Sequence, residues 1–417
     1  MSLTAESEVR RAAGWLPRQQ DLEGWLAGHE QRVGEPGQDR PLHPALHELQ
    51  TLIENDPLIG MLARRMIEEV PAAKAYTRRH LHSPSQLLRL LDAVMTMAPE
   101  FGDQAVTLPM NAILDWTMGT ASGFAFYRNP RVNHALKAVL QAWGEYLNSP
   151  ASLSALNPSP TGWTSPAAAQ AIGIGQYQHD PADPHWGFSS WNDFFTRHFR
   201  DGQRPVAAPD DDSVIVNACE STPYALRTAV QRRDKFWVKE QPYSLHDLLA
   251  RDPTVDAFMG GTVYQAFLSA TDYHRWHSPV TGTVLSARVV AGTYFSEADS
   301  EGPAAVEPQN SQGYLAHVAA RAVIVLRADN PTIGEVAVVA VGMSDVSTCV
   351  LHPDLAPGRH LTKGDELGHF AFGGSTHCLV LRPGAVESFN LSALPSPVDP
   401  RPPLVQVRSA LAHAPRR

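Results

Sequence analysis

The chain has 417 residues, of which 43% are hydrophobic and 18% are charged, so it is long enough for two or three domains with a substantial core. Its formal net charge of -9 argues against binding to nucleic acid and against a general attraction to anionic lipid. The longest apolar runs fall far short of the roughly 20 residues that span a bilayer, and the amino terminus lacks the apolar segment of a signal peptide. We therefore expect a cytoplasmic protein with no integral membrane association.

The three cysteines are far apart in the sequence, and no two of them have the C-x-x-C spacing. Cys219, Cys349 and Cys378 therefore predict neither a disulfide framework nor a zinc site. We expect buried, reduced thiols that pack as small apolar side chains.

The first part of the chain is expected to be helical after a loosely held arm. Residues 1–40 mix charged residues with Gly and Pro, a composition typical of irregular segments. From 41 to 150, apolar residues recur at three- and four-residue steps, which predicts helices with one apolar face each. The three predicted faces are Leu58, Ile59, Leu62 and Met66; Leu87, Leu88, Leu91, Val94 and Met95; and Leu136, Val139, Leu140, Trp143 and Leu147.

The start of one of these helices can be predicted from its sequence. Ser83 is followed by Pro84, a residue favoured at the first helical position, and by Gln86, which is placed to complete a capping box. Ser83 is therefore predicted to be the N-cap.

After residue 150 the pattern changes. Residues 151–186 are rich in Pro, Ser, Gly and Ala, which predicts a linker, and residues 187–395 contain short β-type runs separated by Gly and Pro. We expect an α+β protein in which a helical domain precedes a β-rich domain. Residues 396–417 are rich in Pro and Arg and predict a poorly packed tail. The expected strands cover 213–218, 261–268, 283–290, 322–327, 335–342 and 377–382.

The segment 372–376 (FGGST) has the composition of a site at which a chain can cut itself. If Ser375 attacks the carbonyl of Gly374, the peptide bond becomes an ester, and β-elimination followed by hydrolysis leaves a pyruvoyl group at position 375. Glycine on the acyl side lets the hydroxyl approach and the backbone adopt strained torsions. The alternative is an ordinary tight turn between two strands.

Two further motifs precede this segment. One is 272–284 (DYHRWHSPVTGTV), and the other combines 191–197 (WNDFFTR) with 202–206 (GQRPV). In this order and spacing, the three motifs resemble those of the phosphatidylserine decarboxylase family of pyruvoyl enzymes. The resemblance covers residues 187–395, which it identifies as the catalytic domain.

The resemblance implies a role for individual residues. Gly374 and Ser375 would flank the cleavage point, His277 would be the base in cleavage, and His274 would act in decarboxylation. The family's Ser-Pro-x-Asp-Gly stands here as Asn217-Ala218-Cys219-Glu220-Ser221, a departure that would give Glu220 the task of orienting His277 in place of aspartate. The implied cofactor is a pyruvoyl group made from Ser375.

Other interpretations of the histidines remain open. His274 and His277 can be a pair of hydrogen-bonded histidines in a turn before Ser278-Pro279. A metal site is not predicted, because two histidines without a nearby carboxylate or thiol at ligand spacing make a weak zinc signature. Trp276, Phe372 and His377 are candidates for the substrate pocket, although Trp276 fits a packing role equally well.

Pyruvoyl decarboxylation uses a Schiff base with the substrate amine as the electron sink, and His274 would then return a proton to Cα. The resemblance points first to phosphatidylserine, but no segment has the basic, amphipathic character of a helix that binds a membrane surface. The long helical half resembles the branch of the family that includes soluble tryptophan decarboxylases. We therefore expect a small-molecule amine as substrate, in the sharpest version tryptophan, which would give tryptamine.

Two alternatives to this hypothesis remain open. One is a phosphatidylserine decarboxylase. The other is a non-catalytic relative that never matures, an alternative that the change of the family aspartate to Glu220 favours. The sequence leaves the oligomeric state open, and a homo-oligomer is compatible with it.

Overall fold

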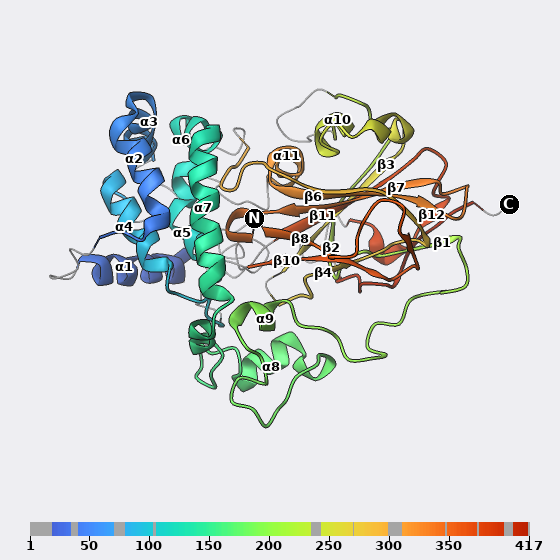
Figure 1. Ribbon diagram of the computed structural model, residues 1–417, viewed down its shortest axis with the longest axis horizontal. Helices are drawn as coiled ribbons and strands as arrows, with labels where there is room; N and C mark the ends of the chain where they lie inside the picture. The colour runs from blue at the N-terminus through green and yellow to red at the C-terminus, as the bar shows by residue number, and fades with distance from the viewer. Residues whose placement is uncertain are drawn as a thin grey trace, which may run out of the picture.

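The computed structural model describes residues 19–34, 41–70, 80–102, 106–234, 243–269, 271–298, 311–346, 348–372, 375–395 and 403–415. Figure 1 shows the helices of the first part gathered on one side of the molecule and the strands on the other. The predicted α+β class, with a helical region before a β-rich region, is confirmed. No helix in the described ranges is both long and apolar enough to cross a membrane.

Seven helices form the first part of the chain. The longest, α7, runs along the boundary with the strands, and the others lie behind it (Figure 1). They are α1 (Gln19–Gly34), α2 (His47–Asn55), α3 (Pro57–Glu68), α4 (Pro84–Val94), α5 (Pro109–Met118), α6 (Ala121–Tyr127) and α7 (Pro130–Leu147).

The predicted cap of α4 is confirmed. Ser83 Oγ accepts a hydrogen bond from Gln86 N at 3.1 Å, and Pro84 is in the first turn. The Gln86 side chain accepts a bond from His82 N at 2.8 Å, one residue before the cap. The predicted apolar faces of α4 and α7 are buried, but Leu58 at the start of α3 is 56% exposed, so its place on the apolar face was wrongly predicted.

The amino-terminal arm is better packed than its composition predicts. Its described part is the helix α1, in which Leu22 and Leu26 are buried. The His29 ring also donates a hydrogen bond from Nε2 to Leu90 O at 3.0 Å. This helix was missed because few apolar side chains are enough to dock it on α4.

Residues 151–186 are likewise more ordered than a linker. They include the 3-10 helix η4 (Pro150–Ala155), the helix α8 (Pro166–Ile172) and the 3-10 helix η5 (Ile174–Gln176), followed by α9 (Trp191–Phe195). Trp163, which lies between η4 and α8, is buried and donates from Nε1 to Pro99 O at 2.8 Å. Pro166, one of the prolines that suggested a linker, stands at the first position of α8, where a missing N–H costs little.

The main sheet is antiparallel and has seven strands in the order β2-β3-β11-β7-β6-β5-β9. Two short helices, α10 (Leu245–Leu248) and α11 (Gln312–Val318), cover one face (Figure 1). The other face shares its apolar core with the helical region. The strands are β2 (Thr222–Thr228), β3 (Thr262–Leu268), β5 (Gly282–Val290), β6 (Arg321–Ala328), β7 (Glu335–Gly342), β9 (His360–Leu361) and β11 (Ser375–Leu381).

Two three-stranded sheets complete the fold. One has the order β4-β10-β8, with β4 (Arg275–His277), β10 (Glu366–Ala371) and β8 (Thr348–Leu351). The other has the order β1-β13-β12, with β1 (Val214–Val216), β13 (Ala410–His413) and β12 (Ser388–Phe389).

The prediction of a poorly packed carboxy-terminal tail is wrong for residues 403–415. β13 lies between two strands, and Val405 exchanges backbone hydrogen bonds with Ser221. Pairing with strands far away in the sequence orders this segment, and its own composition gives no sign of it. The prediction for the cysteines is confirmed, since Cys219, Cys349 and Cys378 are buried and free.

Candidate active site

Ser375 is the first residue of β11, the strand between β3 and β7 in the main sheet. It pairs in register with Leu268 of β3 and with Gly342 of β7. Its side chain is buried, and among the described residues its Oγ has no hydrogen-bond partner. Gly374, the other residue of the predicted cleavage point, lies outside the described residues.

Two connections link the main sheet to the β4-β10-β8 sheet. The β3–β4 connection starts at Leu268, which pairs with Ser375, and leads to His274. The β10–β11 connection starts near Phe370, whose N–H donates to His274 O at 2.9 Å, and leads to Ser375. The segments that carry the two motifs are thus joined at two described points, the pairing of Leu268 with Ser375 and the bond from Phe370 to His274.

His274 is fully buried against the end of α9. Its ring stacks on that of Phe195, with centroids 4.1 Å apart. Burial, reinforced by the positive charge of Arg197, holds the pKa of His274 well below its usual range. His274 is therefore neutral at pH 7 and faces the apolar core.

His277 has a different set of neighbours. Its Nδ1 lies 2.9 Å from Gly364 O and its Nε2 lies 3.1 Å from Tyr273 Oη. Arg408 Nη2 also lies 3.1 Å from Nδ1, so this nitrogen stands between a carbonyl oxygen that can only accept and a guanidinium that can only donate. Burial, with a contribution from the guanidinium of Arg408, lowers the pKa of His277 to about 3. The imidazole is thus neutral at pH 7 and is held by contacts at both ring nitrogens.

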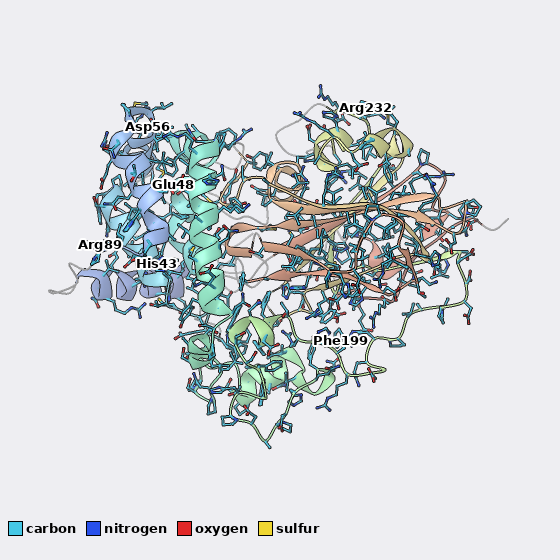
Figure 2. All side chains as sticks on the ribbon, in the orientation of Figure 1. His43, Glu48, Asp56, Arg89, Phe199 and Arg232 are labelled. Carbon is cyan, nitrogen blue, oxygen red and sulfur yellow. The ribbon has the colours of Figure 1, made fainter. Side chains whose placement is uncertain are left out.

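Glu220 is buried, but its hydrogen bonds go elsewhere. It accepts from Arg204 Nη2 at 2.6 Å and from Val407 N at 2.8 Å. In the described part of the chain, the group that orients His277 is the carbonyl of Gly364 and not this carboxylate. The Arg204 guanidinium also lies over the ring of Phe199, 4.3 Å from its centroid. Figure 2 shows where Phe199 lies on the ribbon.

Breaking the buried ion pair between Arg204 and Glu220 is expected to destabilise the fold. Arg204→Met leaves the Glu220 carboxylate uncompensated in a site where the two side chains are 8% and 3% exposed. We expect a loss of about 3–5 kcal/mol in the free energy of unfolding, measured by urea denaturation. The double variant Arg204→Met, Glu220→Leu should recover most of it, because no unpaired charge remains.

A matched control is the exposed pair of Arg327 and Glu335. Arg327 is 62% exposed, so Arg327→Met should cost less than about 1 kcal/mol. Equal losses for Arg204→Met and Arg327→Met would contradict the buried-pair explanation.

Arg197 positions the β3–β4 connection, a role that the sequence did not reveal. Its Nη2 donates to Thr271 O at 2.7 Å and to Asp272 O at 3.3 Å, and its guanidinium lies 4.3 Å from the centroid of the Tyr177 ring. Asp272 Oδ2 accepts from Ser269 N at 2.6 Å, and burial raises the pKa of this carboxyl to about 7. Arg197 is the last residue of one sequence motif and Asp272 is the first residue of another. Their positions in the motifs were the only sequence feature that could have pointed to these two residues.

Three side chains were expected in a substrate pocket. His377 follows Ser375 on the same face of β11 and pairs in register with Ala266 and Ala340, small residues that leave room beside the ring. Burial lowers the pKa of His377 to about 4. Trp276 is fully buried edge-on to Phe370, with centroids 4.8 Å apart, which is a packing contact.

Phe372 points toward the helical region. Its ring lies 6.4 Å from that of Trp143 in α7 and is 5% exposed. Of the three expected pocket residues, His377 is thus the one placed on the face of β11 that carries Ser375.

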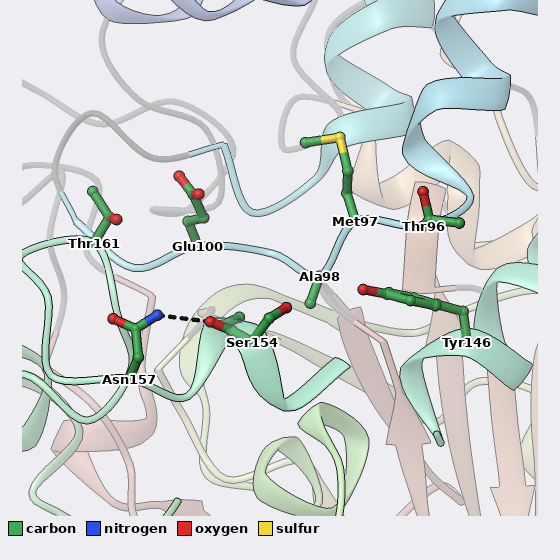
Figure 3. A pocket seen from close by; sticks show the side chains of 9 residues that line it. Thr96, Met97, Ala98, Glu100, Tyr146, Ser154, Asn157 and Thr161 are labelled. Atoms are coloured by element: carbon green, nitrogen blue, oxygen red, sulfur yellow. Dashed lines mark hydrogen bonds between the residues drawn. The ribbon is translucent and has the colours of Figure 1, made fainter. Parts of the chain in front are cut away.

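A separate hollow of about 190 Å³ lies in the helical region (Figure 3). It is lined by the segment after α4, by the end of α7 and by η4, and Asn157 Nδ2 donates to Ser154 O at 2.7 Å on its wall. None of the residues discussed above lines it. Its lining residues are Thr96, Met97, Ala98, Glu100, Tyr146, Ser154, Ala155, Asn157 and Thr161.

Comparisons with known proteins agree with this arrangement. Two family profiles described as phosphatidylserine decarboxylase match residues 43–172 and residues 191–396. The chain is 41% identical over 302 residues to Decarboxylase iboD of Amanita muscaria, which covers 68% of this chain and 86% of that protein. It is 32% identical over 410 residues to the L-tryptophan decarboxylase of Psilocybe cyanescens, which covers 91% and 90%.

A more distant relative matches half of the chain. Phosphatidylserine decarboxylase proenzyme 3 of Schizosaccharomyces pombe is 31% identical over 207 residues, which is 50% of this chain and 20% of that protein. Together with the family profiles and the near full-length relatives, these matches confirm the predicted resemblance. The chain belongs to the phosphatidylserine decarboxylase family and is a decarboxylase.

Proposed function

We propose that this chain cuts itself before Ser375, carries a pyruvoyl group there, and decarboxylates a soluble aromatic L-amino acid, with tryptophan to tryptamine as the favoured reaction. The observation that carries the proposal is the buried hydroxyl of Ser375, which has no hydrogen-bond partner in the described residues and stands at the meeting point of the two sheets. A buried hydroxyl without a partner costs free energy, which is typical of a group kept for chemistry.

The cleavage step balances with this chain's own atoms and one water. Ser375 Oγ attacks the carbonyl carbon of Gly374, the C–N bond breaks, and an ester forms with a free amine. Loss of the Cα proton then expels the Gly374 carboxylate and leaves a dehydroalanine, whose imine tautomer reacts with water to release ammonia and leave the ketone. His277 fits the base, because a neutral imidazole keeps one ring nitrogen free of a proton at pH 7.

The residues present fit a pyruvoyl group. Ser375 is flanked in register by Gly342, so a planar group fits beside β7 without a side-chain collision. When formed, the group supplies an electron sink for the pair released as CO2 leaves. The chain's task is to bind the amino acid, exclude water and hold a proton. The buried His274 is the candidate donor to Cα, a role in which it takes up a proton after the substrate has bound.

The substrate proposal rests on the coverage of the relatives and on the pocket face. The L-tryptophan decarboxylase relative matches 91% of this chain, whereas the phosphatidylserine decarboxylase proenzyme matches 50%. On β11, His377 is paired in register with two alanines, and we propose that an aromatic ring of the substrate stacks on this imidazole. Phosphatidylserine is the second candidate, because the family profiles carry its name.

Maturation and turnover are expected to be visible in one preparation. A denaturing gel should show two pieces, residues 1–374 and the 43 residues from 375 to 417, and the mass of the small piece should be that of a pyruvoyl-blocked peptide. The purified protein should release CO2 from tryptophan and not from phosphatidylserine vesicles, with phenylalanine and tyrosine as intermediate cases. CO2 from vesicles alone would favour the second candidate, and an uncut chain that releases no CO2 from any amine would favour a non-catalytic relative.

A further inference from the structure

Phe372, two residues before Gly374, has a strained backbone. Its φ is +68°, in the left-handed region that side chains other than glycine rarely adopt. For a bulky residue this conformation costs free energy, so other contacts have to hold it. The last described residue before the cleavage point is therefore one whose conformation is imposed by its surroundings.

The contact that holds Phe372 comes from α7. A Cβ added to Gly144 would lie 2.8 Å from Phe372 Cε2 and 3.0 Å from its Cζ, so the ring rests directly on the helix backbone. Beside it, Trp143 contributes a ring 6.4 Å away and is itself fixed by a 2.9 Å hydrogen bond from Nε1 to Met97 O. We call the surface formed by Gly144 and Trp143 the α7 socket.

A second tether joins the helical region to the strand beside Ser375. Asp345, in the 3-10 helix η7 (Ser344–Val346), accepts hydrogen bonds from Met110 N and Asn111 N at the start of α5, both at 2.8 Å. It follows Gly342, the register partner of Ser375, by three residues. The helical region thus contacts the chain at two places near Ser375. One is Phe372, before the cleavage point, and the other is Asp345, after the end of β7 that pairs with Ser375.

We infer that the helical region acts as a clamp for self-cleavage, with Phe372 and Gly144 as its positioning residues. This inference rests on the self-cleavage proposed above. Attack on a neighbouring carbonyl needs the reacting atoms about 3–3.5 Å apart, and a misplacement of about 1 Å can cost 100-fold in rate. The socket fixes the backbone two residues before the scissile carbonyl and thereby limits that misplacement.

The socket can be tested with a single methyl group. Gly144→Ala places a Cβ against the Phe372 ring and should slow the appearance of the 43-residue piece by at least about tenfold. Gly24→Ala, in α1, is the matched control, since nothing lies within 4 Å of its added Cβ, and it should mature at the wild-type rate. Cleavage is followed by denaturing gel from the moment of cell-free synthesis, and folding is followed by thermal unfolding of the same samples.

A compensating change separates positioning from folding. Phe372→Leu removes the Cε2 and Cζ atoms that meet the added methyl, so Gly144→Ala with Phe372→Leu should mature faster than Gly144→Ala alone. If the wild type and Gly144→Ala are cut at the same rate, the clamp is overturned and self-cleavage is still supported. A wild-type chain that stays whole overturns both. If Gly144→Ala does not fold, Phe372→Ala takes its place: slow cleavage with a retained unfolding transition supports the clamp, and wild-type cleavage overturns it.

Discussion

Ser375→Ala is expected to leave the chain whole at 417 residues and to abolish decarboxylation. Without the hydroxyl there is no nucleophile for the Gly374 carbonyl, and no β-oxygen can leave to give the pyruvoyl group. The variant should fold at least as stably as the wild type, because Oγ has no hydrogen-bond partner in the described residues and its removal breaks no bond. A denaturing gel, a CO2 assay and urea denaturation measure the three outcomes.

The control for this variant is Ser388→Ala, an exposed serine in β12 of the same 43-residue piece. It should mature and react as the wild type does. A Ser375→Ala chain that still splits into two pieces, or still releases CO2, would contradict the assignment of the cofactor to position 375. A large loss of stability would show instead that the hydroxyl is held by a bond that matters for folding.

Acid is expected to unfold the protein between pH 6.5 and pH 4. Burial lowers the pKa of seven described histidines, and the lowering is large in five, to about 3 or 4 in four of these, so the unfolded chain takes up protons in this range that the folded chain cannot. Two buried carboxyls with pKa values raised to about 7 act in the opposite direction. Counting the five large shifts alone, five protons against two leave a net three, or about 4 kcal/mol per pH unit. These five histidines are His274, His277, His317, His369 and His377, and the carboxyls are those of Asp272 and Asp345.

The direction in which stability changes with pH follows from the folded-state pKa of each group. A histidine whose pKa is depressed on folding contributes stability above its unfolded pKa of 6.5, which is lost as the pH falls toward its folded value. Urea denaturation at pH 6.5, 5.5 and 4.5 measures the slope. His317→Gln, outside the site, should reduce this slope by about one proton. A flat profile over this range would contradict the buried, neutral state of the histidines.

Much of the fold could be predicted because its signals are local. The apolar period of α7 and the Ser83-Pro84 start of α4 both appear in the structure at the predicted residues. The strands with continuous apolar runs, such as β6 and β7, were predicted to within a residue or two. Local sequence is enough where an element's own composition agrees with its final environment.

The strands that were missed depend on distant partners. β10 carries Gly368, with a φ of +152° and a register shift beside it, so its own sequence gives a weak strand signal. β13 is ordered by pairing with β1, about 200 residues earlier in the chain. Neither dependence can be read from composition or period.

In the candidate site, too, local features could be predicted from the sequence and long-range contacts could not. The motifs indicated which segments to compare, and the structure joins the histidine motif to β10 through the bond from Phe370 N to His274 O. The hydrogen bonds inside the site were not predictable, because they join residues far apart in the sequence, as His277 does with Gly364 and Glu220 with Val407. A motif fixes residue types, whereas the choice between two hydrogen-bond partners depends on the packing of the whole domain.

The central position of β11 has a consequence for the cut protein. Seven consecutive residues of this strand are paired on each side, with β3 and with β7, and β13 from the same carboxy-terminal piece fills the middle of another sheet. A cut before Ser375 would therefore divide the covalent chain without separating the two pieces. The short piece would stay bound, because its strands remain hydrogen-bonded between strands of the long piece. The mature molecule would be a permanent heterodimer made from one gene product, and separating its halves would require dismantling the fold.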